Sequence, residues 1–417
     1  MDRAAEARSA QGVFAAVVAV TIASQFFRAS TGVLGPELIR DLALTPEALG
    51  LANAAFFIAI TAMQIPVGML FDRFGPRRVV AALSLFTVLG ALLQAAAQTE
   101  NAFVMARLLV GIGSAASFMA AVVLCARWFG GPSFGTMLSR VFALSGIGYL
   151  LAGSPWAAFA SWFGWRSAFA ASALAAAFIG WFFFALVRDR PGDSQAERTS
   201  GFAEIIAGYR EVWRTPGLTP ILAMHFVAYA AFITVFGVWA GPYLNDVYGL
   251  RPIARGNALL AMALAQIAAT LAYGPLGRWF ARRTIVVAGA ILSIAPLAIV
   301  VAFPLPADAA ILALVLFCAI SSFSVVNVAD ANSRFAASIA GRGATAVNLF
   351  QVVGTSALPI LSGAIIGLFP EGNDGSRPEA AYRAAFGAIA ACLALGLALY
   401  ALLYKKPEMP NREDRRQ

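Results

Sequence analysis

The chain has 417 residues, of which 60% are hydrophobic and 12% are charged, with a net charge of +9. Soluble domains reach only about 45–50% apolar residues even with glycine counted, and they carry about 25% charged residues. This composition excludes a soluble globular protein, because a fold of this size would leave too much apolar surface in water.

Apolar runs that could span a bilayer follow one another along the whole chain. A spanning helix needs about 20 apolar residues. About twelve runs approach or exceed this length, at residues 12–36, 48–71, 78–97, 102–125, 135–159, 166–187, 218–243, 256–277, 284–303, 309–330, 343–368 and 380–404. The first run is too long for a cleaved signal peptide, so we expect it to be the first helix. The sequence therefore predicts an all-α membrane protein.

The distribution of basic residues explains the net charge. If the loops alternate from an N-terminus inside the cell, 22 Arg and Lys residues lie on the inner segments and 6 on the outer segments. Such a bias marks the cytoplasmic side of a membrane protein. We therefore expect a multi-pass protein of the inner (cytoplasmic) membrane with both termini in the cytoplasm, and no nucleic-acid partner.

The two halves of the chain repeat one another at an offset of 206 residues. The segment GPELIRDLALTPEALG at 35–50 matches GPYLNDVYGLRPIARG at 241–256 in glycine, proline and leucine positions, and Gly148 matches Gly354. The repeat predicts two parallel six-helix bundles, at 1–187 and 218–404. The joining segment 188–217 is predicted to be a cytoplasmic linker with one short amphipathic helix, and 405–417 a cytoplasmic tail. Transporters built from such repeats bind substrate between the halves near the membrane midplane.

Several motifs resemble those of a known family. The loop Gly68-x-x-x-Asp72-Arg73-x-Gly75-Pro76-Arg77-Arg78 resembles the loop signature of the major facilitator superfamily. The run Arg107-x-x-x-Gly111-x-Gly113 resembles its signature in helix 4, and Trp165-Arg166-x-x-Phe169 is also common in its members. The resemblance implies a secondary transporter that works by alternating access, rather than an enzyme.

The same resemblance implies conformational roles for one group of residues. We expect Asp72, with the arginines beside it, to pair with the opposite half in the outward-open state, although a plain topology anchor is the alternative. Arg107 matches a position found widely in the superfamily, so we expect a structural or coupling role for it. The predicted gating residues are Gly68, Asp72, Arg73, Gly75, Arg77, Arg78 and Arg107.

Arg28 is the strongest candidate for substrate binding. An Arg near the bilayer centre costs on the order of 2.5–3.5 kcal/mol and normally faces an interior cavity. Thr21, Gln25, Arg28 and Gly32 recur with helical spacing and form one polar face, on which Gln25 can orient the guanidinium. A guanidinium suits carboxylate or phosphate groups. The alternative role for Arg28 is an inter-helix hydrogen-bond anchor.

The run Phe26-Phe27-Arg28 also resembles helix 1 of the organophosphate–phosphate antiporter branch. That branch usually has a second Arg in helix 7. Here the repeat mate of Arg28 is Thr234, and no Arg lies nearby. A single cationic side chain suits a monoanion such as a carboxylate better than a phosphate dianion. We therefore expect a small, anionic, monocarboxylate-like substrate.

Other polar residues on the predicted helices are candidate cavity residues. The substrate-binding set consists of Arg28, Gln25, Thr234, Gln266, Asn348, Gln351 and Tyr149. Each residue other than Arg28 has the alternative role of an inter-helix hydrogen bond.

His225 is the only histidine in the sequence, and a histidine in a membrane helix suggests proton transfer. It lies nine residues from Thr234, which is about 180° around a helix. If Thr234 faces the cavity, His225 faces away from it. No carboxylate lies clearly at mid-membrane. Glu37 and Asp330 lie near helix ends, so proton coupling through one of them stays an alternative.

No motif for ATP, a metal ion or a nucleophile–base pair occurs, so we expect no cofactor and no metal site. We interpret the chain as a monomeric secondary transporter of a small organic anion. The alternatives are efflux of drugs or amphipathic compounds, and a non-transporting membrane sensor or assembly subunit with the same fold. The fold alone does not decide the substrate or the direction of transport.

Overall fold

The computed structural model describes residues 3–129, 133–188, 215–335, 340–372 and 375–404, which are helical with no strand. The helices before the central segment are α1 (Arg3–Leu42), α2 (Pro46–Ala96), α3 (Glu100–Ser114), α4 (Ala116–Phe129), α5 (Phe134–Ser145), α6 (Ile147–Leu151), α7 (Ser154–Phe163) and α8 (Trp165–Leu186). We call this part the first half.

The second half begins at Leu218. Its helices are α10 (Leu218–Thr234), the π-helical turn η2 (Val235–Trp239), α11 (Ala240–Asp246), α12 (Pro252–Leu276), α13 (Arg282–Ala302), α14 (Ala307–Ile320), the 3-10 turn η3 (Ser321–Phe323), α15 (Ser324–Asn332), α16 (Ala340–Gly367) and α17 (Glu379–Leu403). The predicted amphipathic linker helix and the C-terminal tail lie almost entirely outside the described residues, and the division of the chain into domains stays a prediction.

The described helices form twelve membrane spans. Eleven helical stretches are long and apolar enough to cross a membrane. One of them, α2, has 51 residues and is interrupted at Gly75, whose φ of 76° and ψ of 157° are not helical. Glycine adopts this conformation readily because it has no Cβ. The α2 stretch therefore contains two spans, which confirms the prediction of about twelve.

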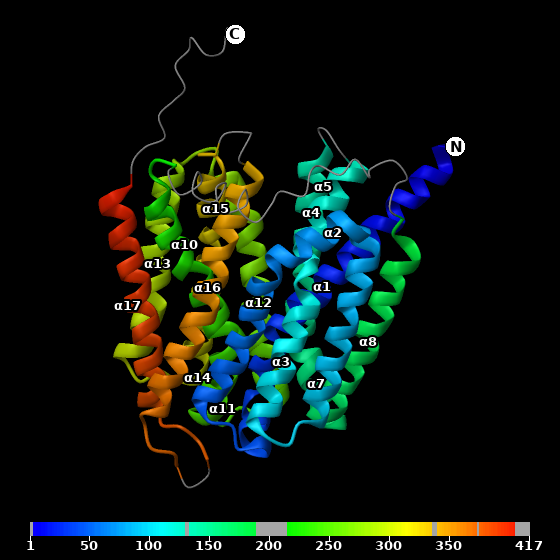
Figure 1. Ribbon diagram of the computed structural model, residues 1–417. Helices are drawn as coiled ribbons and strands as arrows, with labels where there is room; N and C mark the ends of the chain where they lie inside the picture. The colour runs from blue at the N-terminus through cyan, green and yellow to red at the C-terminus, as the bar shows by residue number, and fades with distance from the viewer. Residues whose placement is uncertain (1–2, 130–132, 189–214, 336–339, 373–374, 405–417) are drawn as a thin grey trace.

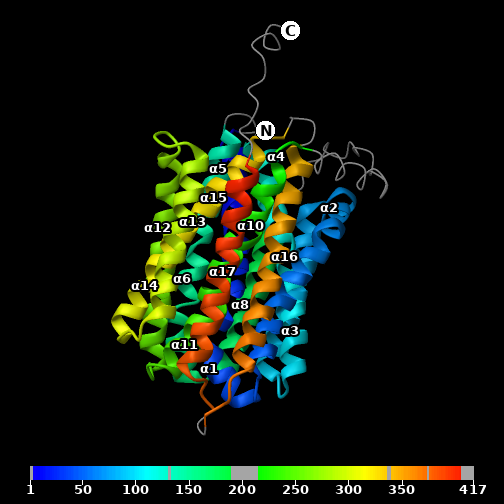
Figure 2. The ribbon, with the colours of Figure 1, turned by 90° about the vertical axis from the view of Figure 1, so that its left-hand side faces the viewer.

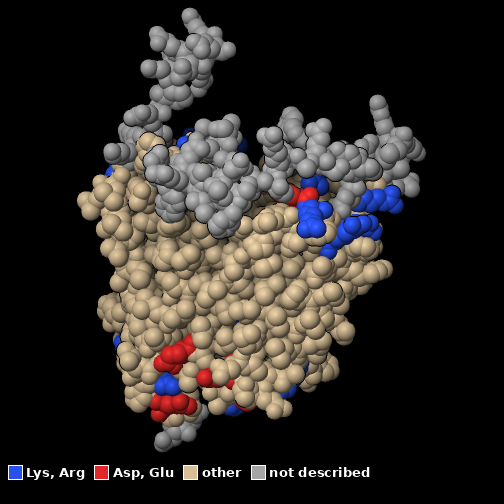
Figure 3. Space-filling view, viewed as in Figure 1, with Lys and Arg blue, Asp and Glu red and all other residues tan. Residues whose placement is uncertain are grey.

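The helices lie roughly alongside one another in two groups (Figures 1 and 2). The beginning of α1 and the end of α17 lie on the same side of the molecule, which we call the terminus side. Figure 3 shows Lys and Arg side chains gathered at this side and a broad belt almost free of charge below it. Large apolar side chains such as Leu174, Trp181 and Leu402 are exposed, as expected of surfaces that contact lipid.

On the side opposite the termini, which we call the far side, backbone contacts seal the two halves together. A Cβ on Gly241 of α11 would lie 1.8 Å from the Gly32 carbonyl oxygen of α1, and one on Gly35 would lie 2.8 Å from Pro242. Likewise, a Cβ on Gly50 of α2 would lie 2.3 Å from the Pro359 carbonyl oxygen of α16. Small residues permit such close approach of membrane helices. The glycines of the repeated segment therefore lie in the contact between the halves.

A buried ion pair reinforces this far-side seal. Arg255 of α12 is 1% exposed, and its Nη2 donates to both carboxylate oxygens of Glu37 on α1 at 2.5 and 2.6 Å. The same guanidinium donates to the Val33 carbonyl oxygen at 3.0 Å and to the Asn245 side chain at 2.9 Å. Arg255 thus joins the second half to α1 of the first half. The seal and the ion pair together define a conformation that is closed on the far side.

Candidate functional site

A cavity of about 320 Å³ lies between the two halves, on the terminus side of the seal. Ligand cavities in proteins commonly measure about 300–1,000 Å³. Its wall comes from both halves. The lining residues are Thr21, Ser24, Gln25, Arg28, Ile60, Gln64, Ser114, Ala115, Ser117, Phe118, Phe142, Ser145, His225, Tyr229, Ser324, Val325, Val328, Asn332, Val347, Asn348, Gln351 and Val352.

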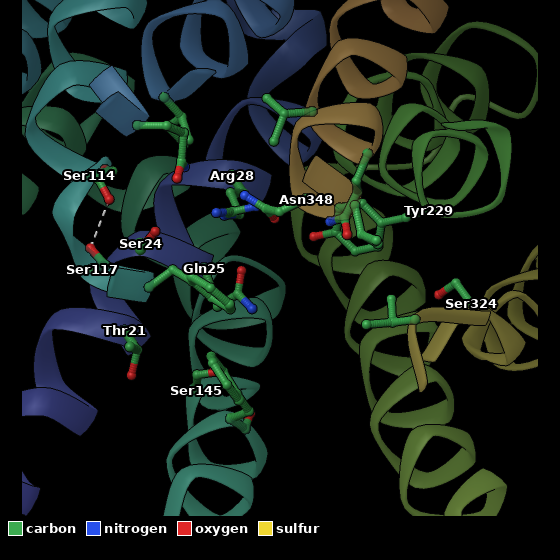
Figure 4. A pocket seen from close by; sticks show the side chains of 18 of the residues that line it. Thr21, Ser24, Gln25, Arg28, Ser114, Ser117, Ser145, Tyr229, Ser324 and Asn348 are labelled. Carbon is green, nitrogen blue, oxygen red and sulfur yellow. Dashed lines mark hydrogen bonds between the residues drawn. The ribbon is translucent and has the colours of Figure 1, made fainter. Parts of the chain in front are cut away.

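Arg28 projects into this cavity from α1 and lies across it from Asn348 of α16 (Figure 4). Its guanidinium carbon lies 5.5 Å from the centre of the Phe57 ring, and its Nε atom is buried without a hydrogen-bond partner. None of the lining residues is Asp or Glu. The cavity therefore contains a cation whose charge no protein carboxylate neutralises, and this arrangement favours an anionic ligand.

Three other residues of the predicted binding set also line the cavity. Gln25 lies one turn from Arg28 on α1, while Asn348 and Gln351 lie one turn apart on α16. The Oε1 atom of Gln25 is buried and has no hydrogen-bond partner. This amide group is available to a ligand bound at Arg28.

Thr234, Gln266 and Tyr149 lie outside the lining in this conformation. Thr234 is fully buried at the end of α10, about 13 Å further along the helix than His225, where the halves are sealed. The Gln266 amide donates to Thr270 on its own helix at 3.1 Å. Tyr149 is buried, and its hydroxyl group hydrogen bonds at 2.8 Å to that of the lining residue Tyr229.

The prediction that His225 faces away from the cavity is wrong. His225 lines the cavity, is 1% exposed, and lies against the Gln351 side chain of α16. The helical geometry used in the prediction holds, because His225 and Thr234 do lie on different faces of α10. The prediction failed because it assumed that Thr234, the repeat mate of Arg28, also lines the cavity.

The sequence interpretation also missed a group of hydroxyl side chains. Ser24 continues the polar face of α1, and Ser114 and Ser117 lie on the facing helices α3 and α4, where the Ser117 hydroxyl donates to the Ser114 carbonyl oxygen at 2.9 Å (Figure 4). Ser145 and Ser324 complete the group. Only Ser24 had a usable signal, since its spacing from Arg28 matches one helical turn.

Arg107 is fully buried and holds three elements of the first half together. Its Nη1 donates to the Phe27 carbonyl oxygen of α1 at 2.8 Å, and its Nη2 donates to the Asn53 side chain of α2 at 3.4 Å. Its guanidinium carbon also lies 4.7 Å from the centre of the Phe56 ring. These contacts involve protein groups rather than the cavity, so they support a structural role.

Replacing Arg107 with alanine is therefore expected to lower stability rather than ligand affinity. Truncating a large buried side chain typically costs about 2–5 kcal/mol. The melting temperature of detergent-purified protein should fall clearly, while the dissociation constant for a bound anion, measured at a temperature where the variant is folded, should change little. An unchanged melting temperature with lost anion binding would instead identify Arg107 as a ligand.

The predicted latch residues lie at the break in α2. Asp72 is exposed and makes no ion pair within the described residues. Arg77 is held within the first half, because its Nε donates to the Phe184 carbonyl oxygen at 2.8 Å and its guanidinium lies over the Phe184 ring. A latch between the halves through Asp72 stays a prediction for the opposite conformation.

The sequence matches the family model of the major facilitator superfamily over residues 17–357. The chain belongs to the major facilitator superfamily. The resemblance of the Asp72 loop and of the Arg107 motif to this superfamily is thereby confirmed. Its relatives carry transporter names rather than enzyme names, in agreement with the prediction of no enzymatic activity.

Curated relatives within this superfamily match parts of the chain. A probable sulfoacetate transporter of Cupriavidus necator is 28% identical over 255 residues, which cover 57% of this chain and 58% of the relative. A probable galactarate/D-glucarate transporter of Escherichia coli is 34% identical over 118 residues, covering 27% and 26%. A quinolone resistance transporter of Acinetobacter baumannii is 25% identical over 138 residues, covering 33% and 32%. The chain thus spans less than two thirds of the length of these relatives.

Solved superfamily structures match the whole fold. A bacterial homologue of the human lysosomal transporter Spinster, in an inward-facing and unoccupied conformation, superposes with a TM-score of 0.79 at 16% identity and covers 96% of this chain and 99% of its own. A D-xylose–proton symporter superposes with a TM-score of 0.78 at 14% identity, covering 95% and 98%. At these identities the likeness shows the superfamily fold alone.

Proposed function

We propose that this member of the major facilitator superfamily transports a small organic anion by alternating access, with Arg28 binding its carboxylate group. The observation that carries the proposal is the uncompensated guanidinium in a cavity without a lining carboxylate. A charged Arg near the bilayer centre costs on the order of 2.5–3.5 kcal/mol. A bound anion offsets this cost, because its negative charge neutralises the guanidinium inside the cavity.

The surroundings of Arg28 support a small and polar substrate. Hydroxyl groups on α1, α3 and α4 face amide groups on α16 across a cavity of about 320 Å³. A single cation matches one carboxylate group, and a cavity of this volume has room for a small organic anion together with water. The names of two relatives, for sulfoacetate and for galactarate or glucarate, also denote organic anions.

The conformation supports alternating access. The far side is sealed by α1 against α11 and by α2 against α16, whereas the cavity lies on the terminus side. We assign the terminus side to the cytoplasm of the inner membrane, because the basic residues gather there (Figure 3). The structure then corresponds to the inward-facing state of the cycle.

The proposal is tested by counterflow in proteoliposomes, combined with a thermal-shift screen. Radiolabelled lactate, glycolate, glycerate, sulfoacetate and glucarate are compared with nitrate and with the cationic dye ethidium. We expect a small monocarboxylate to exchange and to raise the melting temperature, since a ligand at 100 times its dissociation constant adds about 2.7 kcal/mol of stability. Response to ethidium alone would support drug efflux, and exchange of none of the compounds would contradict organic-anion transport.

A further inference from the structure

His225 is the one titratable side chain of the cavity wall that ordinarily changes charge between pH 5 and 8. It is 1% exposed, its two ring nitrogens are buried, and it lies against the neutral amide side chain of Gln351. The cavity is the only space onto which this side chain opens among the described pockets.

Among the described residues, the groups packed around His225 provide no carboxylate for an imidazolium ion. Gln351 of α16 faces it and is neutral, and Tyr229 follows one turn later on α10. On α15, Asp330 forms an ion pair with Arg334 at 3.7 Å. On α17, the buried Tyr400 lies one turn after Gly396, which packs against Met224 and Val227 of α10. On α1, the charged group of the cavity wall is Arg28.

An imidazolium ion at this position would therefore share the empty cavity with a second cation. Like charges and burial both disfavour the protonated form. An anion bound at Arg28 reverses this balance, because it neutralises the guanidinium and supplies a negative charge inside the same cavity. Anion binding and proton binding then favour one another, and by linkage the effect is reciprocal.

We propose that His225 binds a proton that travels with the anion, so that the protein is an anion–proton symporter. This inference rests on the organic-anion transport proposed above. The proton binds a ring nitrogen from water on one side of the membrane and leaves to water on the other side. A monoanion and one proton carry no net charge together, and the cavity holds one positive charge both when empty and when loaded.

This stoichiometry has an energetic consequence for uptake. An anion that enters alone against a membrane potential of 100 mV, negative inside, requires about 2.3 kcal/mol. An anion that enters with a proton requires no work against the potential. Each unit of pH difference then provides about 1.36 kcal/mol, which corresponds to tenfold accumulation of the anion.

The test uses the full-length protein in proteoliposomes, with the potential set to zero by valinomycin and equal potassium concentrations. Radiolabelled lactate, glycolate and glycerate serve as probes. Counterflow at uniform pH tests anion transport, and accumulation under an inward gradient of one pH unit tests proton coupling. The variants are His225→Asn and His225→Gln, which keep a polar side chain, and the control is Ser161→Ala, which changes an exposed residue of α7 that does not line the cavity.

For the unmodified protein and the Ser161→Ala control, we expect accumulation of about tenfold. His225→Asn and His225→Gln should keep counterflow within about threefold of the unmodified protein, but their accumulation should fall towards onefold. The Asn and Gln side chains differ in length, so if one of the two variants does not fold, the other still reports on the role of His225. Accumulation retained by a His225 variant would overturn the role of His225, and counterflow without accumulation in the unmodified protein would overturn symport. Absence of counterflow with all probes would instead overturn the proposed anion transport.

Discussion

Replacing Arg28 with glutamine is expected to weaken anion binding by about 30-fold or more while leaving the protein at least as stable as before. Losing one partner of a buried, hydrogen-bonded charge pair costs about 2–5 kcal/mol of binding free energy. Within the part of the chain that the structure describes, the guanidinium forms no ion pair, so its removal disrupts no such contact and relieves an unpaired charge. The measurements are the half-saturating concentration for lactate counterflow and the melting temperature without ligand.

Two further variants sharpen the Arg28 experiment. Arg28→Lys keeps the charge but loses the planar pair of donors, so we expect an intermediate loss. Arg140→Gln removes an exposed cation of α5 that does not line the cavity, and it should bind anions normally. If Arg28→Gln binds the anions as tightly as the unmodified protein, Arg28 is a helix anchor and the anion site lies elsewhere.

Replacing Glu37 with glutamine is expected to shift the protein away from the conformation described here. The variant leaves the fully buried guanidinium of Arg255 without its carboxylate partner. Breaking a buried ion pair typically costs about 3–5 kcal/mol, which is about a 150- to 5,000-fold change in a conformational equilibrium. Because Arg255 and Glu37 belong to different halves, this cost falls on the far-side-closed state and not on the state in which the halves separate there.

Spin labels at Arg140 of α5 and at Trp279 after α12 can report this shift, since both residues are exposed on the terminus side of different halves. The distance between the labels should shorten in Glu37→Gln as the terminus side closes. Asp41→Asn is the matched control, because Asp41 lies at the same end of α1 but accepts a hydrogen bond from Trp165 within the first half. An unchanged distance distribution in Glu37→Gln would show that the backbone seal alone holds the conformation.

The fold was largely predictable from the sequence because a bilayer imposes simple requirements on it. Twelve apolar runs matched the observed spans to within several residues, including the two that join across Gly75 into α2. The interruptions inside spans were not predicted. The π-helical turn at Val235–Trp239 has no composition signal of its own, and it arises where the chain packs against α1 around Gly32.

The site was predictable only in part. Arg28 was identified because a charge in an apolar helix is costly wherever it lies, and that cost is visible without a structure. The position of His225 was not, because the repeat equates positions along the chain and does not show how deep the cavity reaches in one conformation. Thr234, the repeat mate of Arg28, lies within the sealed region, whereas His225 lies beyond it. The pairing of Glu37 with Arg255 joins residues 218 positions apart, and no local pattern indicates it.

The far-side seal separates two kinds of evolutionary constraint. Several of its close contacts join glycines to backbone carbonyl oxygens, as at Gly241 with Gly32 and at Gly50 with Pro359. Carbonyl oxygens are the same in every residue, so this surface tolerates change in neighbouring side chains but not at the glycines. The cavity wall, by contrast, consists of side chains such as Ser24 and Asn348 that single substitutions can alter. Related proteins can thus acquire new substrates through substitutions in the cavity wall, while the backbone contacts between the two halves stay the same.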